Sequence, residues 1–321
     1  MPEKKTVFME GGEFYKGNLH CHSVVSDGSL TIRELKEIYV RKGYQFMVFS
    51  DHNVYGNYVE MNSPGFIAVQ GFEGHIDMSG ADDFREFHFI MLPGPKALRE
   101  SAGKPFFNHL DKTPVTRFKG NRSIQKYIND MNGRGYMVMA CHPHWSTAEY
   151  DDILGLENLF AVEIYNHACH LVNMCGALVL WDALLRRGKR IWGTAVDDNH
   201  NQFPVHSQYF DSCGGWVSVK AKSLKEEDIC ESLANGSFYS SQGPEIRDFY
   251  VEDGHAYLSC SPVNKIYFVG DSRGNYSDMA PEGEDSLTFS CKKLKGKTKY
   301  IRAECVDAAG KRAVSNPIFF E

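Results

Sequence analysis

The 321-residue sequence predicts an α/β protein, with a β/α barrel followed by a small antiparallel β domain. Two observations predict this arrangement. Up to about residue 243, short apolar runs alternate with amphipathic segments and end in polar loops, which is the order of a β/α repeat. After Gly243-Pro244, short alternating segments are separated by glycine turns, as in a β-sandwich. We therefore expect one domain over residues 1–243 and another over residues 244–321.

The first element carries the motif around which the chain is organised, His20-x-His22 followed by Asp27. In an extended segment the two histidines point to the same face, so both imidazoles can bind one metal ion. A helix is then predicted over residues 31–42, because Thr31-x-x-Glu34 has the pattern of a capping box. Gly43 is expected to end that helix.

The later elements repeat this order. Short apolar runs predict buried strands over residues 44–50, 66–70, 86–92, 136–140, 160–165, 190–196 and 216–219. Helices are expected over residues 123–131 and 172–187, and a further helix is expected to open at Ser223 and Glu226. Residues 94–120 contain three prolines and show little periodicity, so we predict a long connection there. Beyond residue 244 the pattern predicts strands without helices.

Histidines and carboxylates follow or lie within most of these strands. In a β/α barrel the C-terminal strand ends converge on one mouth, so these side chains would meet in one pocket. Imidazole and carboxylate together suit Mn, Zn, Fe or Ni better than Ca or Mg alone, and the set is too large for one ion. The side chains are His20, His22, Asp27, Asp51, His52, Glu73, His75, His88, His142, His144, Asn166, His167, Asp198 and His200.

Composition limits the function classes. The net charge of −6 argues against strong nucleic-acid binding, which needs a basic surface. No apolar run approaches the roughly 20 residues of a membrane span, and the N-terminus lacks the apolar core of a signal peptide. Nine cysteines without a CxxC pair indicate reduced thiols, and Cys21 and Cys141 are expected to be core residues. We expect a cytoplasmic protein that acts on a small molecule and can form a homo-oligomer.

Several motifs resemble those of the PHP (polymerase and histidinol phosphatase) family, in order and in residue type. They are His20-x-His22, Ser26-Asp27-Gly28, Ser50-Asp51-His52, Glu73, His142-Pro143 and Asp198-x-His200, and they span about residues 15–243. The resemblance implies a distorted seven-stranded, TIM-like β/α barrel with two or three divalent ions, usually Mn, Zn or Fe. Members of the family include histidinol phosphatases, nucleoside bisphosphate and oligonucleotide phosphatases, and exonuclease modules of DNA polymerases.

The resemblance also implies three sets of metal ligands. The sets are His20, His22, Glu73 and Asp198 for one ion, Asp27, His52 and His200 for a second, and Glu73, His88 and His142 for a third. His75 competes with His88 for the third set, and we prefer His88 because it lies in the next strand. Asp51 and Asp197 are expected to hydrogen-bond loops or orient a neighbouring imidazole.

The implied reaction is attack on phosphorus by a hydroxide that bridges two ions. His144 and His167 are the candidates for proton transfer or phosphate binding. For a basic clamp on the phosphate, the candidates are Arg85, Arg117 and Lys119. Trp145 is expected either to stack on a base or sugar or only to pack at the rim.

The C-terminal region leaves the substrate open. Residues 300–318 are similar to the tails of a PHP branch described as carbaryl-hydrolase-like metallohydrolases. Three functions therefore remain. The first is hydrolysis of a small phosphomonoester or nucleotide-type phosphoester, the second is hydrolysis of a non-phosphate ester or carbamate, and the third is metal binding or protein interaction without turnover. The β domain can shape the pocket, form a dimer or cap the barrel.

Overall fold

The computed structural model describes residues 4–78, 85–101, 109–110, 116–118, 121–273 and 276–320. The helices in these ranges are α1 (Ile32–Arg41), α2 (Pro95–Ser101), α3 (Asn121–Gly133), α4 (Tyr150–Leu154), α5 (His167–Leu171), α6 (Leu178–Arg186) and α7 (Glu226–Ala234), with a 3-10 turn η1 at Val59–Met61. None of the described helices has the length and apolarity needed to cross a membrane.

The strands up to residue 243 are β1 (Lys5–Thr6), β2 (Glu13–Asn18), β3 (Phe46–Val48), β4 (Ile67–Val69), β5 (Phe72–Met78), β6 (Glu86–Pro93), β7 (Thr116–Phe118), β8 (Tyr136–Ala140), β9 (Ala161–Asn166), β10 (Trp192–Val196), β11 (Trp216–Ala221) and β12 (Phe238–Ser241). The later strands are β13 (Ile246–Glu252), β14 (His255–Val263), β15 (Lys265–Gly270), β16 (Tyr276–Met279), β17 (Leu287–Lys293), β18 (Tyr300–Val306), β19 (Arg312–Ser315) and β20 (Ile318–Phe319).

The fold is of the mixed α/β class, and the strands in the described ranges form three sheets. A six-stranded sheet has the order β10-β9-β8-β6-β5-β7, and a ten-stranded sheet runs β16-β15-β18-β19-β12-β11-β2-β3-β4 with β20 on β18. No sheet closes on itself among the described residues, so the pairing does not show the predicted seven-stranded closed barrel. Two isolated parallel bridges join the two open sheets, one between Cys21 and Asn199 and one between His52 and Glu73.

Local sequence explains where α1 begins and what it packs against. The Thr31 side chain accepts a hydrogen bond from the Glu34 backbone, and the Glu34 carboxylate accepts one from the Thr31 backbone, so the predicted capping box is confirmed. Leu35 and Tyr39 of this helix are buried in one cluster with Phe49, which follows β3. The helix thus packs against the strand that leads to His52.

Two predicted segments differ from the structure. Residues 94–120, predicted as an irregular connection, include α2 and β7. Pro95 begins α2, where a proline is tolerated because the first helical N–H has no partner within the helix. The helix predicted over residues 172–187 is replaced by α5, which ends before Val172, and by α6, which begins at Leu178.

The opening of α7 also differs from the prediction. Its N-cap is Lys225, and the Ser223 hydroxyl instead donates to the Asp228 carboxylate at 2.5 Å. Three acidic residues lie in the first turn of α7, and their negative charges stabilise the helix because its dipole is positive at the N-terminus. The helix begins at Glu226, one of the two residues at which the prediction placed its opening.

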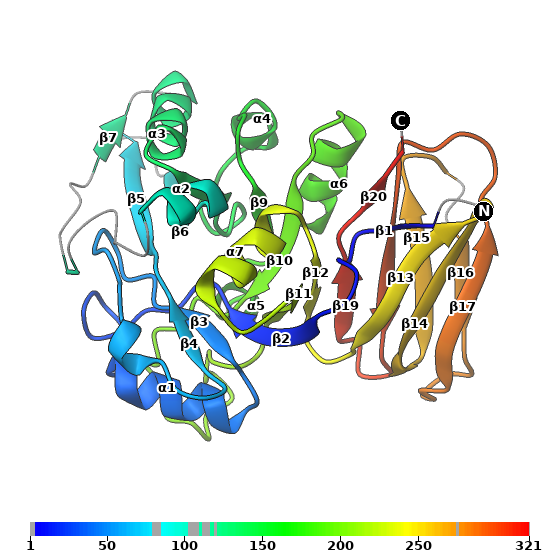
Figure 1. The fold of residues 1–321 in the computed structure, drawn as a ribbon, viewed down its shortest axis with the longest axis horizontal. Helices are drawn as coiled ribbons and strands as arrows, with labels where there is room; N and C mark the ends of the chain where they lie inside the picture. The colour runs from blue at the N-terminus through cyan, green and yellow to red at the C-terminus, as the bar shows by residue number, and fades with distance from the viewer. Residues whose placement is uncertain are drawn as a thin grey trace.

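Residues 244–320 contain strands and no helix wherever they are described, and they lie at one end of the molecule together with β1 (Figure 1). A four-stranded sheet, β1-β13-β14-β17, faces the β15-β18 end of the ten-stranded sheet. Phe249 and Leu258 of the first sheet share a buried cluster with Phe268 and Ala303 of the second. The two faces therefore pack as a sandwich.

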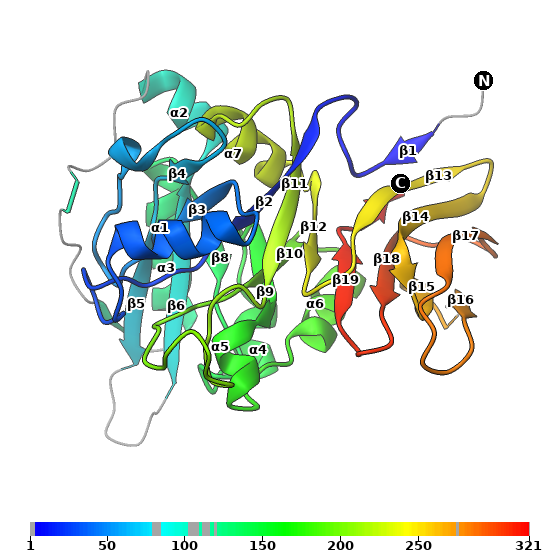
Figure 2. The same ribbon diagram turned by 90° about the horizontal axis from the view of Figure 1, so that it is seen from below.

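The ten-stranded sheet continues from the N-terminal part into this sandwich, because β12 pairs with β19 (Figure 2). The Asn316 side chain strengthens the junction. Its oxygen accepts from the Gly193 backbone at 3.0 Å, and its amide donates to the carbonyls of Gly236 and Phe238. The domain boundary at residues 243 and 244 stays a prediction, and the backbone pairing across it is continuous.

Candidate metal centre

The predicted ligands lie where the two open sheets meet. His20 and His22 follow β2, His52 follows β3, His142 follows β8, and Asp198 and His200 follow β10. Glu73 and His88 lie inside β5 and β6, which pair antiparallel. His88 therefore reaches the centre from the interior of an antiparallel strand instead of from a strand end.

Glu73 is the centre of the cluster, and its side chain is 0% exposed. Neither carboxylate oxygen has a partner with hydrogen-bond geometry among the described residues. A buried carboxylate without hydrogen bonds is costly unless positive charge lies next to it. Nitrogens of five imidazoles surround it, at 2.9 Å for His52, 3.1 Å for His88, 3.2 Å for His20, 3.3 Å for His22 and 3.5 Å for His142. This donor set fits a carboxylate that bridges divalent ions.

The first predicted ligand set is compact and buried. The Nε2 atoms of His20 and His22 lie 3.0 Å apart, and Oδ1 of Asp198 lies 3.1 Å from each. Asp198 has a φ of 56°, a left-handed conformation that turns its carboxylate back toward the two imidazoles. Its backbone N–H donates to the His20 carbonyl at 3.0 Å, which fixes this turn. Three possible ligand atoms thus lie within 3.1 Å of one another.

The pKa shifts of the two histidines indicate that the carboxylates of this set stabilise a positive charge next to them. Burial by itself would lower the pKa of His22, but contacts with Asp198 and Glu73 outweigh it and raise the pKa to about 10. Burial also opposes a charge on His20, while Asp198, Glu73 and Glu163 raise its pKa well above the ordinary value. A divalent ion held by these atoms would supply the charge that protons otherwise bring.

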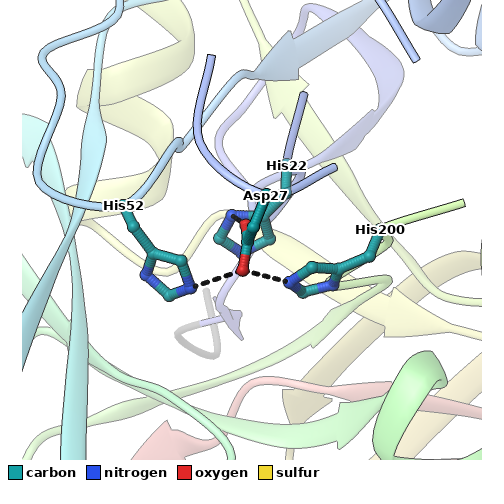
Figure 3. Close-up of side chains that lie close together, drawn as sticks. All are labelled: His22, Asp27, His52 and His200. Carbon is teal, nitrogen blue, oxygen red and sulfur yellow. Dashed lines mark ion pairs between the residues drawn. The ribbon is translucent and has the colours of Figure 1, made fainter. Parts of the chain in front are cut away.

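The second predicted set faces solvent. Asp27 lies between two imidazoles, with Oδ2 at 3.4 Å from His200 Nε2 and 3.6 Å from His52 Nε2 (Figure 3). His22 also approaches it, because its Nδ1 lies 3.6 Å from Oδ1 of Asp27. The Asp27 side chain is 53% exposed, unlike the carboxylates of the first set. An ion at this position would be reachable from outside.

The third predicted set is arranged around one oxygen of Glu73. His88 Nδ1 lies 3.1 Å and His142 Nε2 lies 3.5 Å from Oε1. Burial lowers the pKa of His88 to about 4, so this imidazole is neutral and can act as a ligand. His75 is paired with His88 across the strands, and its Nε2, like that of His88, lies 3.8 Å from Oε2 of Glu86. The structure thus brings His88 beside Glu73, and its preference over His75 as a metal ligand stays a prediction.

Asp51 and Asp197 bind loops, the role predicted for them. Asp51 accepts hydrogen bonds from the backbone and hydroxyl groups of both Ser23 and Ser26, which shapes the segment between His22 and Asp27. Asp197 accepts from the Tyr39 hydroxyl and from three backbone N–H groups over residues 213–215.

The two cysteines beside the ligands are buried. Cys21 packs in the cluster of α1, and Cys141 packs in a neighbouring cluster. The Cys141 sulfur lies close enough to His20 and Glu73 for all three to contact one ion. Burial raises the pKa of the Cys141 thiol well above its ordinary value, so we keep the interpretation of a neutral core residue.

A cavity of about 290 Å³ opens onto the cluster. Six predicted ligands line it, together with an apolar side made by Trp145, Ala168, Cys169 and Val172. The Trp145 ring lies 4.9 Å from the His142 ring, between centroids, and forms part of this wall. The six ligands are Asp27, His52, His88, His142, Asp198 and His200.

The predicted proton-transfer residues lie outside this lining. His144 is exposed on the loop after β8, and His167 begins α5, where its Nδ1 lies 2.9 Å from the Tyr165 hydroxyl. Burial lowers the pKa of His167 to about 4. The structure does not bring either imidazole to the metal cluster, and their roles stay predictions.

The predicted basic clamp is not assembled in the described part of the chain. Arg85 pairs with Asp152, its Nη1 lying 3.0 Å from Oδ1. Arg117 lies on β7, and Lys119 lies outside the described residues.

Sequence reasoning missed one carboxylate at the centre, Glu163 on β9. Its Oε1 lies 2.7 Å from Nδ1 of His20, and its side chain is buried. A signal for it was present, because a glutamate inside the apolar run over residues 161–165 must find a partner if the strand is buried. The prediction instead took this strand only as a buried element that ends at Asn166 and His167.

Comparison with known proteins gives partial likenesses. No family model matches the chain. A 40-residue stretch is 52% identical to part of the DNA polymerase/3'-5' exonuclease PolX of Bacillus subtilis. The matched stretch covers 12% of this chain and 7% of that polymerase. The chain thus corresponds to a small fraction of that relative's length.

Solved structures similar to this chain include PHP-like proteins. A two-domain protein of Bacteroides vulgatus that contains a predicted PHP-like metal-dependent phosphoesterase aligns over 98% of both chains, at 14% identity and a TM-score of 0.48. A Bifidobacterium adolescentis protein described as a metal-dependent phosphoesterase aligns over 60% of this chain and 90% of that one, at 15% identity and a TM-score of 0.41. An amidohydrolase of Chromobacterium violaceum aligns over 57% and 87%, at 13% identity and a TM-score of 0.41.

Proposed function

We propose that this chain is a PHP-type metal-dependent hydrolase that cleaves a small phosphomonoester or nucleotide-type phosphoester. One observation carries the proposal. The buried Glu73 carboxylate lies within 3.5 Å of a nitrogen of five imidazoles, and no described residue gives either oxygen a hydrogen bond. This arrangement fits a carboxylate that bridges divalent ions, because such ions would supply the missing positive charge.

Two or three ions, Mn, Zn or Fe, would be held by the three ligand sets. Such ions polarise a phosphoryl oxygen and lower the pKa of a coordinated water. The ligands form a buried side and a solvent-facing side of the centre. His20, His22 and Asp198 form the buried side, and Asp27 and His200 form the side from which a substrate enters. Trp145 offers an aromatic wall for the leaving group.

The proposal includes the predicted barrel and domain boundary. The bridges of Cys21 with Asn199 and of His52 with Glu73 support a distorted barrel, since they join the open sheets beside the ligands. In this arrangement residues 1–243 carry the metal centre, and residues 244–321 form the β domain. A cytoplasmic location, a small-molecule substrate and a homo-oligomeric state stay predictions.

Hydrolysis of a carboxyl ester or carbamate is the second candidate, and the cavity lining favours it. No lysine or arginine is found among the described residues that line the cavity, and one side of it is apolar. A phosphomonoester dianion is commonly bound by arginine or lysine, whereas a neutral ester needs no such clamp. A neutral leaving group would fit against Ala168, Cys169 and Val172.

Phosphate release tests the two candidates. Protein loaded with Mn is expected to release inorganic phosphate from at least one member of a broad phosphoester panel, and a chelator is expected to abolish the release. Restoration by added Mn is the control against denaturation by the chelator. Metal-loaded protein that cleaves aryl esters or carbamates and releases no phosphate would contradict the first candidate in favour of the second. If neither class of substrate is cleaved, both hydrolase candidates are contradicted, and the third candidate, a metal-binding protein without turnover, is favoured.

A further inference from the structure

We infer that Glu163 is a positioning residue of the metal centre, which sets the tautomer of His20 and holds the segments that carry His142 and Asp198. The inference rests on the metal-dependent function proposed above. Glu163 lies on β9, the strand between β8 and β10, and it belongs to none of the predicted ligand sets. It is 1% exposed, so its carboxylate must be satisfied from within the protein.

The two oxygens of Glu163 have different partners. Oε1 lies 2.7 Å from Nδ1 of His20, and Oε2 accepts the backbone N–H of His142 at 2.8 Å. Oε2 also accepts from the Asn166 amide at 3.0 Å. Because a carboxylate only accepts, the proton of the first contact lies on Nδ1 of His20. The lone pair of Nε2 then points to His22 and Asp198, where a ligand atom is needed.

Asn166 extends this support to a second ligand. Its side-chain oxygen accepts the Cys169 backbone N–H at 3.0 Å, which identifies the nitrogen as the atom that faces the centre. That nitrogen donates to Oε2 of Glu163 and, at 2.9 Å, to Oδ2 of Asp198. The other oxygen of Asp198 remains directed at His20 and His22, 3.1 Å from each.

Glu163 also holds the backbone at a third ligand. His142 has a φ of 23°, a conformation that L-residues rarely adopt. The hydrogen bond from its N–H to Oε2 of Glu163 stabilises this turn, while the imidazole lies 3.5 Å from Glu73. One buried carboxylate therefore organises residues from the ends of β2, β8 and β10.

The variant Glu163→Gln separates positioning from packing, because it keeps the shape of the side chain. Two N–H groups converge on the place of Oε2, so the amide oxygen will occupy it and the amide N–H will face Nδ1 of His20. That contact favours the His20 tautomer with the proton on Nε2. A protonated Nε2 has no lone pair with which to bind a metal. We expect about a 10- to 100-fold weaker metal affinity, measured by competition with a chromophoric chelator.

The matched control is Glu226→Gln. Glu226 accepts from the backbone and side chain of Gln70 and belongs to none of the ligand sets, so its replacement is expected to leave metal affinity unchanged. Thermal unfolding of the metal-free variants, followed by circular dichroism, checks that both remain folded. Glu163→Asp is the second variant, since it keeps the acceptor and loses the shape. A positioning role predicts tighter metal binding by Glu163→Asp than by Glu163→Gln, and a packing role predicts the reverse order.

Metal affinity of Glu163→Gln within twofold of the wild-type value would overturn the inference and leave the proposed function standing. The reverse order of the two Glu163 variants would also overturn it. Wild-type protein that retains no metal at all would overturn the proposed function, and the inference with it.

Discussion

Replacing Glu73 with glutamine is expected to release bound metal and to lower turnover by about a thousand-fold or more. The amide keeps the volume of the side chain but loses the negative charge around which five imidazoles are arranged. Without that charge, cations bound on both sides of residue 73 would repel one another with nothing between them. Elemental analysis of dialysed protein measures the metal, and hydrolysis of the best substrate from the panel measures turnover.

Glu86→Gln is the matched control for this variant. Glu86 lies at the rim, 44% exposed, and its Oε2 is 3.8 Å from Nε2 of His88, so it also borders an imidazole of the cluster. We expect this variant to keep its metal and most of its activity. If Glu73→Gln retained the wild-type metal content, Glu73 would not be a bridging ligand and the proposed centre would be wrong.

Much of the candidate centre could be predicted because local patterns determine it. The period of two expected for an extended segment placed His20 and His22 on one face, and in the structure, where both follow β2, their Nε2 atoms lie 3.0 Å apart. The apolar runs over residues 136–140 and 190–196 predicted strands that end next to ligands, and β8 and β10 are found there. Each of these inferences needs only the residues of one short segment.

The remaining features depend on segments that are far apart in sequence. Whether the sheets close is decided by pairing between strands such as β4, β5, β10 and β11, and no local pattern reports it. The antiparallel pairing of β6 with β5 and β8 is of the same kind. The partner of Glu163 lies 143 residues away, so the sequence could indicate that a partner was required but not that it was His20.

A second large effect is expected at the contact between the two parts of the chain. Arg302 on β18 is 1% exposed, and its guanidinium binds both carboxylate oxygens of Asp182 on α6, at 2.9 and 3.1 Å. It also donates to Glu304 at 2.5 Å and lies over the Trp181 ring. Arg302→Met is expected to lower the free energy of unfolding by roughly 3 kcal/mol, because Asp182, which is only 18% exposed, loses its cation and the buried Glu304 keeps only its pair with Arg312.

Urea unfolding of the metal-free protein measures this effect without a contribution from bound metal. Arg312→Met is the matched control, since Arg312 pairs with the same Glu304 at 2.7 Å but is 45% exposed. That control is expected to cost only about 0–1 kcal/mol. Equal losses in the two variants would show that the Arg302 pair is no stronger than a surface ion pair.

Removing the whole network distinguishes an uncompensated charge from lost packing. The triple variant Arg302→Met, Asp182→Leu and Glu304→Met leaves no buried charge at this contact, and it is expected to recover most of the stability lost in Arg302→Met. Asp182 lies on α6 and Arg302 lies on β18, so the network joins the metal-binding part to the β domain. The urea unfolding curves of these variants should therefore also reveal whether the two parts unfold together. A single transition in every variant would mean that the β domain and the metal-binding part form one cooperative unit.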